Sequence, residues 1–131
     1  MGIKDLAEQA QTEIKSLTVD ETLPRYSDSD SDLVFVDVRD IREVENSGTI
    51  KGAKHAPRGM IEFLFDPESP YYREMYGDPD KTYVLFCNAE WRSALCAKSL
   101  QDMGIKNVAQ LFGGLPAWQD AGGPTEEKKR K

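Results

Sequence analysis

Three short segments rich in apolar residues stand out along the chain, at 33–38 (LVFVDV, interrupted only by Asp37), 82–87 (TYVLFC) and 107–111 (NVAQL). Each segment predicts a strand, and because the first shows no alternation of apolar and polar residues, it predicts a strand that is covered on both faces, as in a parallel sheet. A further short strand is expected within the turn-rich segment 46–57 (NSGTIKGAKHAP).

Helical patterns lie between and around these runs. Good helix formers with apolar residues at helical spacing predict helices at 4–14 and 91–103, the latter ending at Gly104. The TVDE sequence at Thr18–Glu21 has the spacing of a capping box and predicts a second short helix, disturbed near Pro24. Shorter helices are expected near 59–65 and within 113–122. Strands that alternate with helices indicate an open, mostly parallel α/β sheet.

The length of 131 residues suits a single domain with a substantial core. We divide the chain into an N-terminal helix at 1–13, a central domain at 14–123 and a charged, frayed tail at 124–131. The acidic run SDSDSD at 27–32 is interpreted as a solvated surface loop. A phosphoacceptor or cation-binding role is the alternative for this run.

The composition and charge of the chain argue against several classes of function. The net charge of −6 disfavours nonspecific nucleic-acid binding. No apolar run approaches the length of a membrane span, and the N-terminus lacks the apolar core of a signal peptide, so we expect a cytoplasmic protein. Two cysteines, Cys87 and Cys96, and one histidine, His55, do not make a closed zinc site, and no metal is expected. A structural disulfide is not expected in a reducing cytosol.

Cys87 ends the second strong strand and precedes a loop and a helix, where parallel sheets place their sites. The backbone N–H groups of residues 88–93 and the start of the helix favour an anion there. Arg92 adds a fixed charge suited to oxyanions, and the same field stabilises a thiolate. Cys87 is therefore a candidate nucleophile, with a buried core residue as the alternative. Cys96 has Leu100 and Met103 at helical spacing, which indicates core packing.

Four segments, FVDVRD, GTIKGAKHAP, FCNAEWRSALCAKSL and VAQLFGGLPAW, resemble in order and spacing the motifs of the rhodanese (thiosulfate:cyanide sulfurtransferase) domain, in its single-domain form. The resemblance spans residues 14–122. It implies a three-layer α/β fold with a mainly parallel five-stranded sheet flanked by helices. It also implies that Cys87 takes the sulfane sulfur of a donor such as thiosulfate, holds it as a persulfide and passes it to a thiol or cyanide. No cofactor or metal is implied.

The resemblance assigns the catalytic role to Cys87 within a six-residue loop that ends at Arg92. Related phosphatases carry one residue more, so the loop length favours sulfur over phosphoryl transfer. It also implies a set of substrate-binding residues: Asn88, Ala89, Glu90, Trp91, Arg92, Ser93 and Arg58. Ser93 either hydrogen-bonds the sulfur or caps the helix. The expected ligands are a small anionic sulfur donor and a thiol or cyanide acceptor, which includes the thiol of another protein.

Other matching positions have structural interpretations. Asp37 and Arg39 form the D-x-R motif, and the aspartate at a buried strand end needs hydrogen-bond donors. Arg39 is expected to pair with Glu43 or to face the pocket. For His55, a turn-stabilising role is favoured over a general base. The GG-x-x-AW element, Gly113, Gly114 and Trp118, is interpreted as a tight turn with a packed tryptophan.

Glu90 departs from the family pattern, in which glycine is frequent three residues after the cysteine. A glutamate here either strains the loop or points into solvent, and one that points inward repels an anionic donor. Two alternatives to a sulfurtransferase therefore stay open. One is a phosphatase or arsenate reductase on the same fold, and the other is a noncatalytic interaction module. The sequence does not identify the physiological donor, the acceptor or the oligomeric state.

Overall fold

The structure, a computed structural model, describes residues 1–26 and 31–128. Its helices are α1 (Ile3–Glu13), α2 (Val19–Tyr26), α3 (Ile41–Ser47), α4 (Ile61–Phe65), α5 (Trp91–Asp102) and α6 (Gly114–Asp120), with a 3-10 turn, η1, at Glu74–Tyr76. Its strands are β1 (Ser16–Leu17), β2 (Leu33–Asp37), β3 (Thr49–Ile50), β4 (Lys54–His55), β5 (Thr82–Phe86), β6 (Val108–Leu111) and β7 (Thr125–Glu126).

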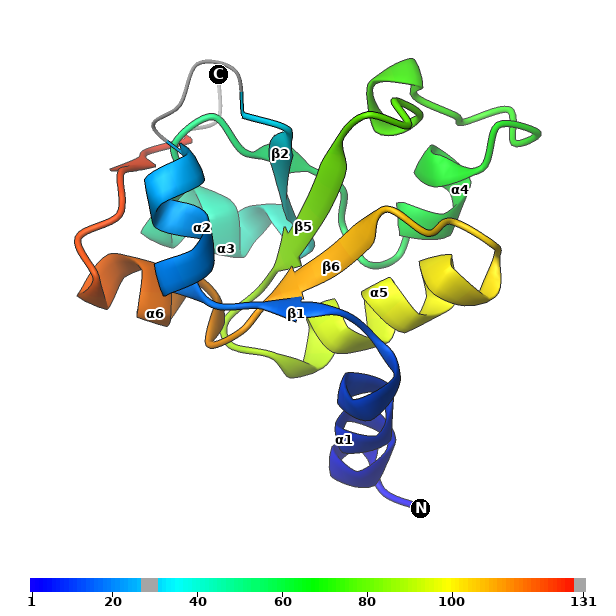
Figure 1. The fold of residues 1–131 in the computed structure, drawn as a ribbon, viewed down its shortest axis with the longest axis horizontal. Coiled ribbons are helices and arrows are strands. Elements are labelled where there is room, and N and C mark those ends of the chain that lie inside the picture. Colours follow the sequence, from blue (N-terminus) through cyan, green and yellow to red (C-terminus); the bar gives the residue numbers. More distant parts are fainter. Residues whose placement is uncertain (27–30, 129–131) are drawn as a thin grey trace.

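Five strands form the central sheet in the order β1-β6-β5-β2-β4, and every neighbouring pair is parallel. Helices α4 and α5 cover one face, while α2 and α6 lie on the other (Figure 1). The three apolar runs form β2, β5 and β6, at the centre of the sheet. The expected three-layer α/β fold with a five-stranded parallel sheet is therefore confirmed.

The side chains of successive residues of β5 pack into two separate hydrophobic cores, one on each face of the sheet. Tyr83 and Leu85 pack on one face with Leu100 of α5, whereas Val84 and Phe86 pack on the other with Trp118 of α6. All six side chains are inaccessible to solvent. Burial on both faces explains why the sequence of this strand shows no alternation.

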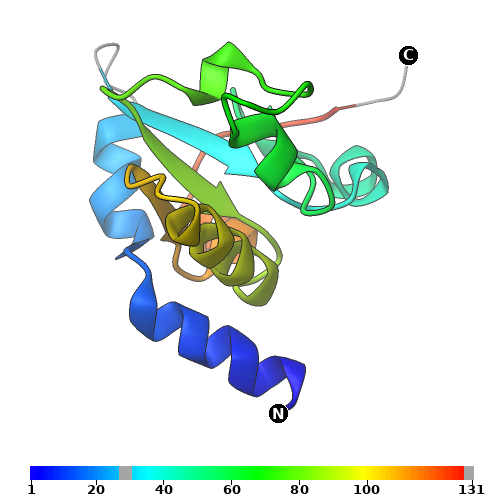
Figure 2. The same ribbon diagram turned by 90° about the vertical axis from the view of Figure 1, so that its right-hand side faces the viewer.

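Helix α1 lies against α5 rather than apart from the domain (Figure 2). Its Ala7 and Ala10 are buried, so their small side chains allow the two helices to approach closely. The predicted capping box is present at the start of α2: Thr18 Oγ1 accepts from the Glu21 N–H at 3.1 Å, and the Thr18 N–H donates to Glu21 Oε1 at 3.0 Å.

Two parts of the chain differ from the sequence-based description. The tail expected from residue 124 begins as a strand, because β7 pairs antiparallel with β3, and the Glu126 carboxylate accepts from the Gly52 N–H at 2.6 Å. Most of the SDSDSD run, residues 27–30, and the last residues, 129–131, lie outside the described part of the chain. Asp32, at the end of that run, pairs with Arg25.

Helix α3 was not predicted, although it is central to the site described below. Its N-cap is Asp40, whose carboxylate accepts from the Arg42 N–H at 2.8 Å. The spacing of Asp40 and Glu43 is the signal that marks this helix start in the sequence. Within the described residues, none of the helices is both long enough and apolar enough to cross a membrane.

Candidate active site

Cys87 follows the last residue of β5 and lies at the carboxyl edge of the sheet, as expected. Its side chain is almost completely buried, with 1% of the residue exposed. A pocket of about 320 Å3 opens above it, lined by Cys87, Asn88, Ala89, Glu90, Trp91 and Arg92. The structure thus brings the residues of the predicted six-residue loop together around one cavity.

The backbone of this loop supplies hydrogen-bond donors to the pocket region. Within the described residues, the N–H groups of residues 88–93 have no acceptor. Unpaired N–H groups at the start of a helix attract anions because their partial positive charges add together. The loop is therefore equipped to receive the oxygens of an anionic substrate.

The turn that begins α6 packs against the backbone of the Cys87–Arg92 loop and helps to fix its shape. The Leu115 N–H donates to the Cys87 carbonyl at 3.0 Å. A Cβ atom at Gly114, where φ is +61°, would lie 2.3 Å from the Cys87 carbonyl oxygen and 2.2 Å from that of Ala89. Only glycine fits this approach of two backbone segments. The GG-x-x-AW element thus supports the loop as well as packing Trp118.

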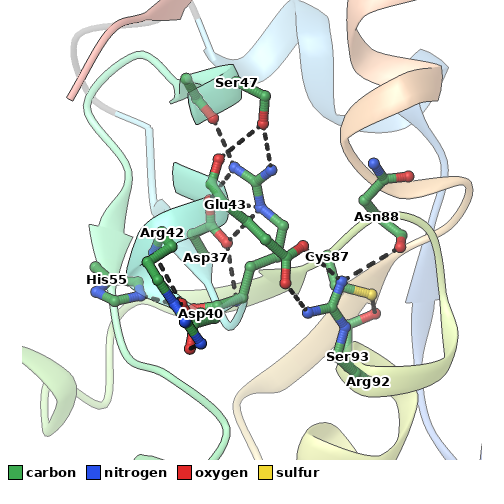
Figure 3. A network of polar contacts seen from close by, with 12 residues as sticks. Asp37, Asp40, Arg42, Glu43, Ser47, His55, Cys87, Asn88, Arg92 and Ser93 are labelled. Atoms are coloured by element: carbon green, nitrogen blue, oxygen red, sulfur yellow. Dashed lines mark hydrogen bonds and ion pairs between the residues drawn. The ribbon is translucent and has the colours of Figure 1, made fainter. Parts of the chain in front are cut away.

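Arg92 is held at the side of the pocket by a carboxylate from α3. Its guanidinium makes a paired contact with Glu43, with Nη1–Oε1 at 2.6 Å and Nη2–Oε2 at 3.0 Å (Figure 3). Nη2 also lies 3.4 Å from the Asn88 carbonyl oxygen. The hydrogen bond from Arg92 lowers the pKa of Glu43, and Glu43 in turn raises the pKa of Arg92. The expected pairing of Glu43 with Arg39 is wrong, since Arg92 occupies the carboxylate.

This pair predicts a measurable pH dependence. The pKa of Glu43 is lowered in the folded protein, so the pair stabilises the fold above the ordinary carboxylate pKa and is lost as the pH falls through the lowered value. We expect Arg92→Met to move the pKa of Glu43 back toward its ordinary value. The free energy of unfolding of the variant and of the wild type should then converge as the solution is acidified. Carbon-13 NMR of the Glu43 carboxyl measures the titration, and identical curves in both proteins would contradict the prediction.

Arg39 is buried, with 1% of the residue exposed, and is not among the residues that line the Cys87 pocket. Its Nε and Nη2 donate to the Asp37 carboxylate at distances from 2.8 to 3.2 Å. Its other bonds go to Ser47 Oγ at 2.9 Å and the Gly48 carbonyl at 2.6 Å, while Thr49 Oγ1 donates to Asp37 at 2.8 Å. This buried network ties β2 to the end of α3, the helix that carries Glu43.

His55 lies on β4, where its Nε2 is 2.8 Å from the Arg39 carbonyl oxygen (Figure 3). It is not among the residues that line the Cys87 pocket. The contact joins β4 to the D-x-R segment. This placement agrees with a structural role for the histidine and not with a general base at the sulfur.

Ser93 lies under the nucleophile and contacts it directly, with Oγ 3.5 Å from Cys87 Sγ. The same hydroxyl is 3.0 Å from Gln110 Oε1 and 3.1 Å from the Glu90 carbonyl oxygen. Sequence reasoning missed Gln110, which is completely buried on β6. A lone glutamine within the apolar run VAQL was the available signal, because a buried amide requires polar partners.

Glu90 neither strains the loop nor extends into solvent, so both expectations for it are wrong. Its φ of −137° lies outside the left-handed region that favours glycine. The carboxylate accepts from the Gly113 N–H at 2.9 Å and from Gln11 Nε2 at 3.2 Å. Glu90 therefore connects the loop to α6 and α1, and its charge is engaged with two donors.

The remaining predicted residues lie around this centre. Trp91 stands at the rim of the pocket with 43% of its surface exposed. Arg58 is exposed and is not among the lining residues, so its contact with a donor remains a prediction. Cys96 is buried, and burial raises the pKa of its thiol to about 12, which keeps it neutral. Both cysteines are free thiols.

The sequence and fold of the chain are similar to those of known proteins. A model of the Rhodanese-like domain matches residues 18–121, which include the D-x-R segment, the cysteine loop and the glycine turn. The chain belongs to the rhodanese-like family. The putative sulfurtransferase YtwF of Bacillus subtilis is 34% identical to it over 107 residues, which are 82% of this chain and 92% of YtwF.

Two solved structures illustrate the range of this rhodanese-like fold. A Rhodopseudomonas palustris protein of unknown function, described as a possible tyrosine phosphatase, is 45% identical, with a TM-score of 0.89 over 96% of this chain and 95% of that one. The thiosulfate sulfurtransferase of Pseudomonas aeruginosa is 26% identical, with a TM-score of 0.79 over 98% of this chain. This chain spans only 23% of that enzyme, and 48% of another curated relative.

Proposed function

We propose that the protein is a sulfurtransferase that carries sulfane sulfur as a persulfide on Cys87. The observation that supports this most directly is the buried Cys87 sulfur at the floor of a pocket walled by unpaired N–H groups and Arg92. A thiolate and an anionic donor are both stabilised by such a site. The family relationship and the sulfurtransferase named among the relatives support the same reaction.

The first half-reaction loads the enzyme. The Cys87 thiolate attacks the outer sulfur of thiosulfate, a new S–S bond forms, and the original S–S bond breaks with its electron pair leaving on sulfite. The loop N–H groups and Arg92 hold the sulfonate oxygens while negative charge moves onto the departing sulfite. Trp91 at the rim limits access to the sulfur.

The second half-reaction unloads the enzyme. Cyanide or a thiolate attacks the outer sulfur of the persulfide, and Cys87 leaves as a thiolate, which restores the starting state. Over the two half-reactions, one sulfur atom moves from the donor to the acceptor, and no external oxidant or reductant is needed. Free, buried cysteines are compatible with a reducing compartment such as the cytoplasm, where low-molecular-weight and protein thiols are the available acceptors.

Mass spectrometry of the wild-type protein tests this proposal. After incubation with thiosulfate or with polysulfide, we expect the protein to gain one sulfur atom, located on Cys87 by peptide mapping. Addition of cyanide should remove that sulfur and release an equivalent of thiocyanate. A protein that gains no sulfur from either donor contradicts the proposal.

A phosphatase is the second candidate, because the 45% identical structure is described as a possible tyrosine phosphatase. The six-residue loop, Cys87–Arg92, is one residue shorter than the phosphatase loops of the related fold and leaves less room for a phosphate group. Turnover of an aryl phosphate that requires Cys87, together with no sulfur uptake, would favour this candidate. We expect the opposite result.

A further inference from the structure

A chain of polar side chains leads from the surface to the nucleophile through the interior of the domain. It begins at Ser16 of β1, which is exposed, passes through Gln110 of β6 and Ser93 of α5, and ends at Cys87. Gln110 Nε2 lies 3.2 Å from Ser16 Oγ, and Gln110 Oε1 lies 3.0 Å from Ser93 Oγ. Ser93 and Gln110 are completely buried, so these contacts are their means of satisfying their polar groups.

The placement of the Gln110 amide, with its oxygen toward Ser93 and its nitrogen toward Ser16, suits a neutral thiol. The S–H of Cys87 donates to Ser93 Oγ, the Ser93 hydroxyl donates to Gln110 Oε1, and the Gln110 amide donates to Ser16 Oγ. In this arrangement the one proton of the Ser93 hydroxyl points away from the sulfur.

A thiolate requires the opposite direction, because it can only accept. The side-chain amide of Gln110 has an oxygen and a nitrogen of nearly the same shape, so a half-turn about its terminal bond exchanges donor and acceptor without repacking. Gln110 then donates to Ser93 Oγ, the Ser93 hydroxyl donates to the sulfur of Cys87, and the Ser16 hydroxyl donates to the amide oxygen. The proton released by Cys87 passes to water, and each buried group keeps a partner.

We propose that Gln110 is a positioning residue for the nucleophile: by reversing its amide it supplies Ser93 with a donor and directs the Ser93 hydroxyl toward the charged sulfur. The same arrangement serves the persulfide, whose inner sulfur also accepts. The role in sulfur transfer rests on the proposed function, whereas the effect on the thiolate does not. Leucine or valine at this position would pack equally well on a buried strand but would leave Ser93 without this donor.

The Glu90 carbonyl oxygen competes with the Cys87 sulfur for the proton of the Ser93 hydroxyl, and a hydrogen bond donated by Gln110 to Ser93 affects this competition. The Glu90 carbonyl oxygen lies 3.1 Å from Ser93 Oγ, and it already accepts from the Ala94 N–H at 3.0 Å. Without Gln110, the Ser93 proton is shared between this carbonyl and the sulfur. With Gln110 as donor, the two-bond chain polarises the hydroxyl and strengthens its bond to the thiolate.

The test compares Gln110→Met, which preserves shape, with the wild type in the pH profile of Cys87 alkylation by iodoacetamide. We expect the midpoint of the Gln110→Met profile to move to higher pH and the rate at neutral pH to fall about three- to tenfold. The rate on the alkaline plateau should not fall, because every sulfur is then a thiolate, and a thiolate of higher pKa is a slightly stronger nucleophile. A loosened loop would instead change the plateau. An unchanged profile overturns the proposal.

The charged and titratable groups that surround the sulfur stay the same in this comparison. They are Arg92 and Cys96 from α5, Glu90 from the loop, Glu43 from α3, and Asp37 at the end of β2 with its partner Arg39. Cys96 is neutral, Asp37 and Glu43 are each paired with an arginine, and the Glu90 carboxylate accepts from the Gly113 N–H and Gln11. A shift in the profile is therefore attributable to the substituted amide.

A double-mutant cycle with Ser93→Ala tests whether Gln110 acts through Ser93. In the Ser93→Ala background, Gln110→Met should cause no further change, and independent effects of the two substitutions overturn the proposal. Gln101→Met, on the exposed side of α5, is the matched control and should match the wild type.

A measurement on the wild-type protein covers the case in which Gln110→Met does not fold. The nitrogen-15 resonance of the Gln110 side chain should shift with pH at the same midpoint as Cys87 alkylation, and a resonance that does not follow the sulfur overturns the proposal. Sulfur uptake is measured separately. A wild-type protein that takes no sulfur, yet shows the Gln110-dependent profile, would refute the proposed function while supporting the positioning role.

Discussion

Replacing Cys87 with serine should abolish sulfur uptake completely, whereas replacing Cys96 with serine should leave it intact. The two thiols are both buried, but their surroundings differ. Cys87 opens into the pocket lined by its own loop and contacts the Ser93 hydroxyl. Cys96 lies within the core on α5, where burial raises the pKa of its thiol to about 12. A thiol in that state presents almost no nucleophilic thiolate near neutral pH.

The measurement is the intact mass of each protein after incubation with thiosulfate, together with the rate of thiocyanate formation. Circular dichroism of both variants verifies that the fold is retained. Sulfur uptake by Cys87→Ser would refute the assignment of the nucleophile. Loss of uptake in a folded Cys96→Ser protein would show that the second cysteine takes part in transfer.

Arg39→Met should reduce the free energy of unfolding by about 3–5 kcal/mol, the usual cost of leaving one partner of a buried ion pair alone. The Asp37 and Arg39 side chains are each only 1% exposed, and the guanidinium satisfies Ser47 and Gly48 as well as the carboxylate. Methionine fills a similar volume but provides no charge or donor. Because small domains are stable by about 5–15 kcal/mol, such a loss takes much of the total. Urea denaturation measures it.

The double variant Asp37→Asn with Arg39→Met separates charge from packing. Asparagine keeps an acceptor oxygen for the backbone N–H of residue 39, its amide nitrogen donates to the Thr49 hydroxyl instead of accepting from it, and the uncompensated charge is removed, so the double variant should be more stable than Arg39→Met alone. A double variant that is equally or more unstable would contradict the electrostatic explanation. Arg42→Ala removes an exposed ion pair with Asp40 and should leave the stability unchanged.

The strands and the loop were predictable because their signals are local. Apolar-rich runs mark β2, β5 and β6, and the cysteine at the end of β5 with an arginine five residues later marks the anion loop. By contrast, β1, β3, β4 and β7 are two residues long, and so short a stretch has no readable periodicity. Helix α3 was missed although Asp40 supplies an N-cap, because seven residues give a weak apolar pattern.

By itself, the sequence determined the parallel α/β sheet, the position of Cys87 at its carboxyl edge and the length of the loop, since each depends on residue order alone. Which charges meet was decided only by the tertiary structure. Glu43 pairs with Arg92 across 49 positions of sequence, and Glu90, which lines the pocket, binds the Gly113 N–H and Gln11 instead of extending into solvent. Gln110 likewise reaches Ser93 only because β6 lies beside β5. Charged and polar side chains are long enough to choose among several partners, and the packing of the backbone selects which partner lies within reach.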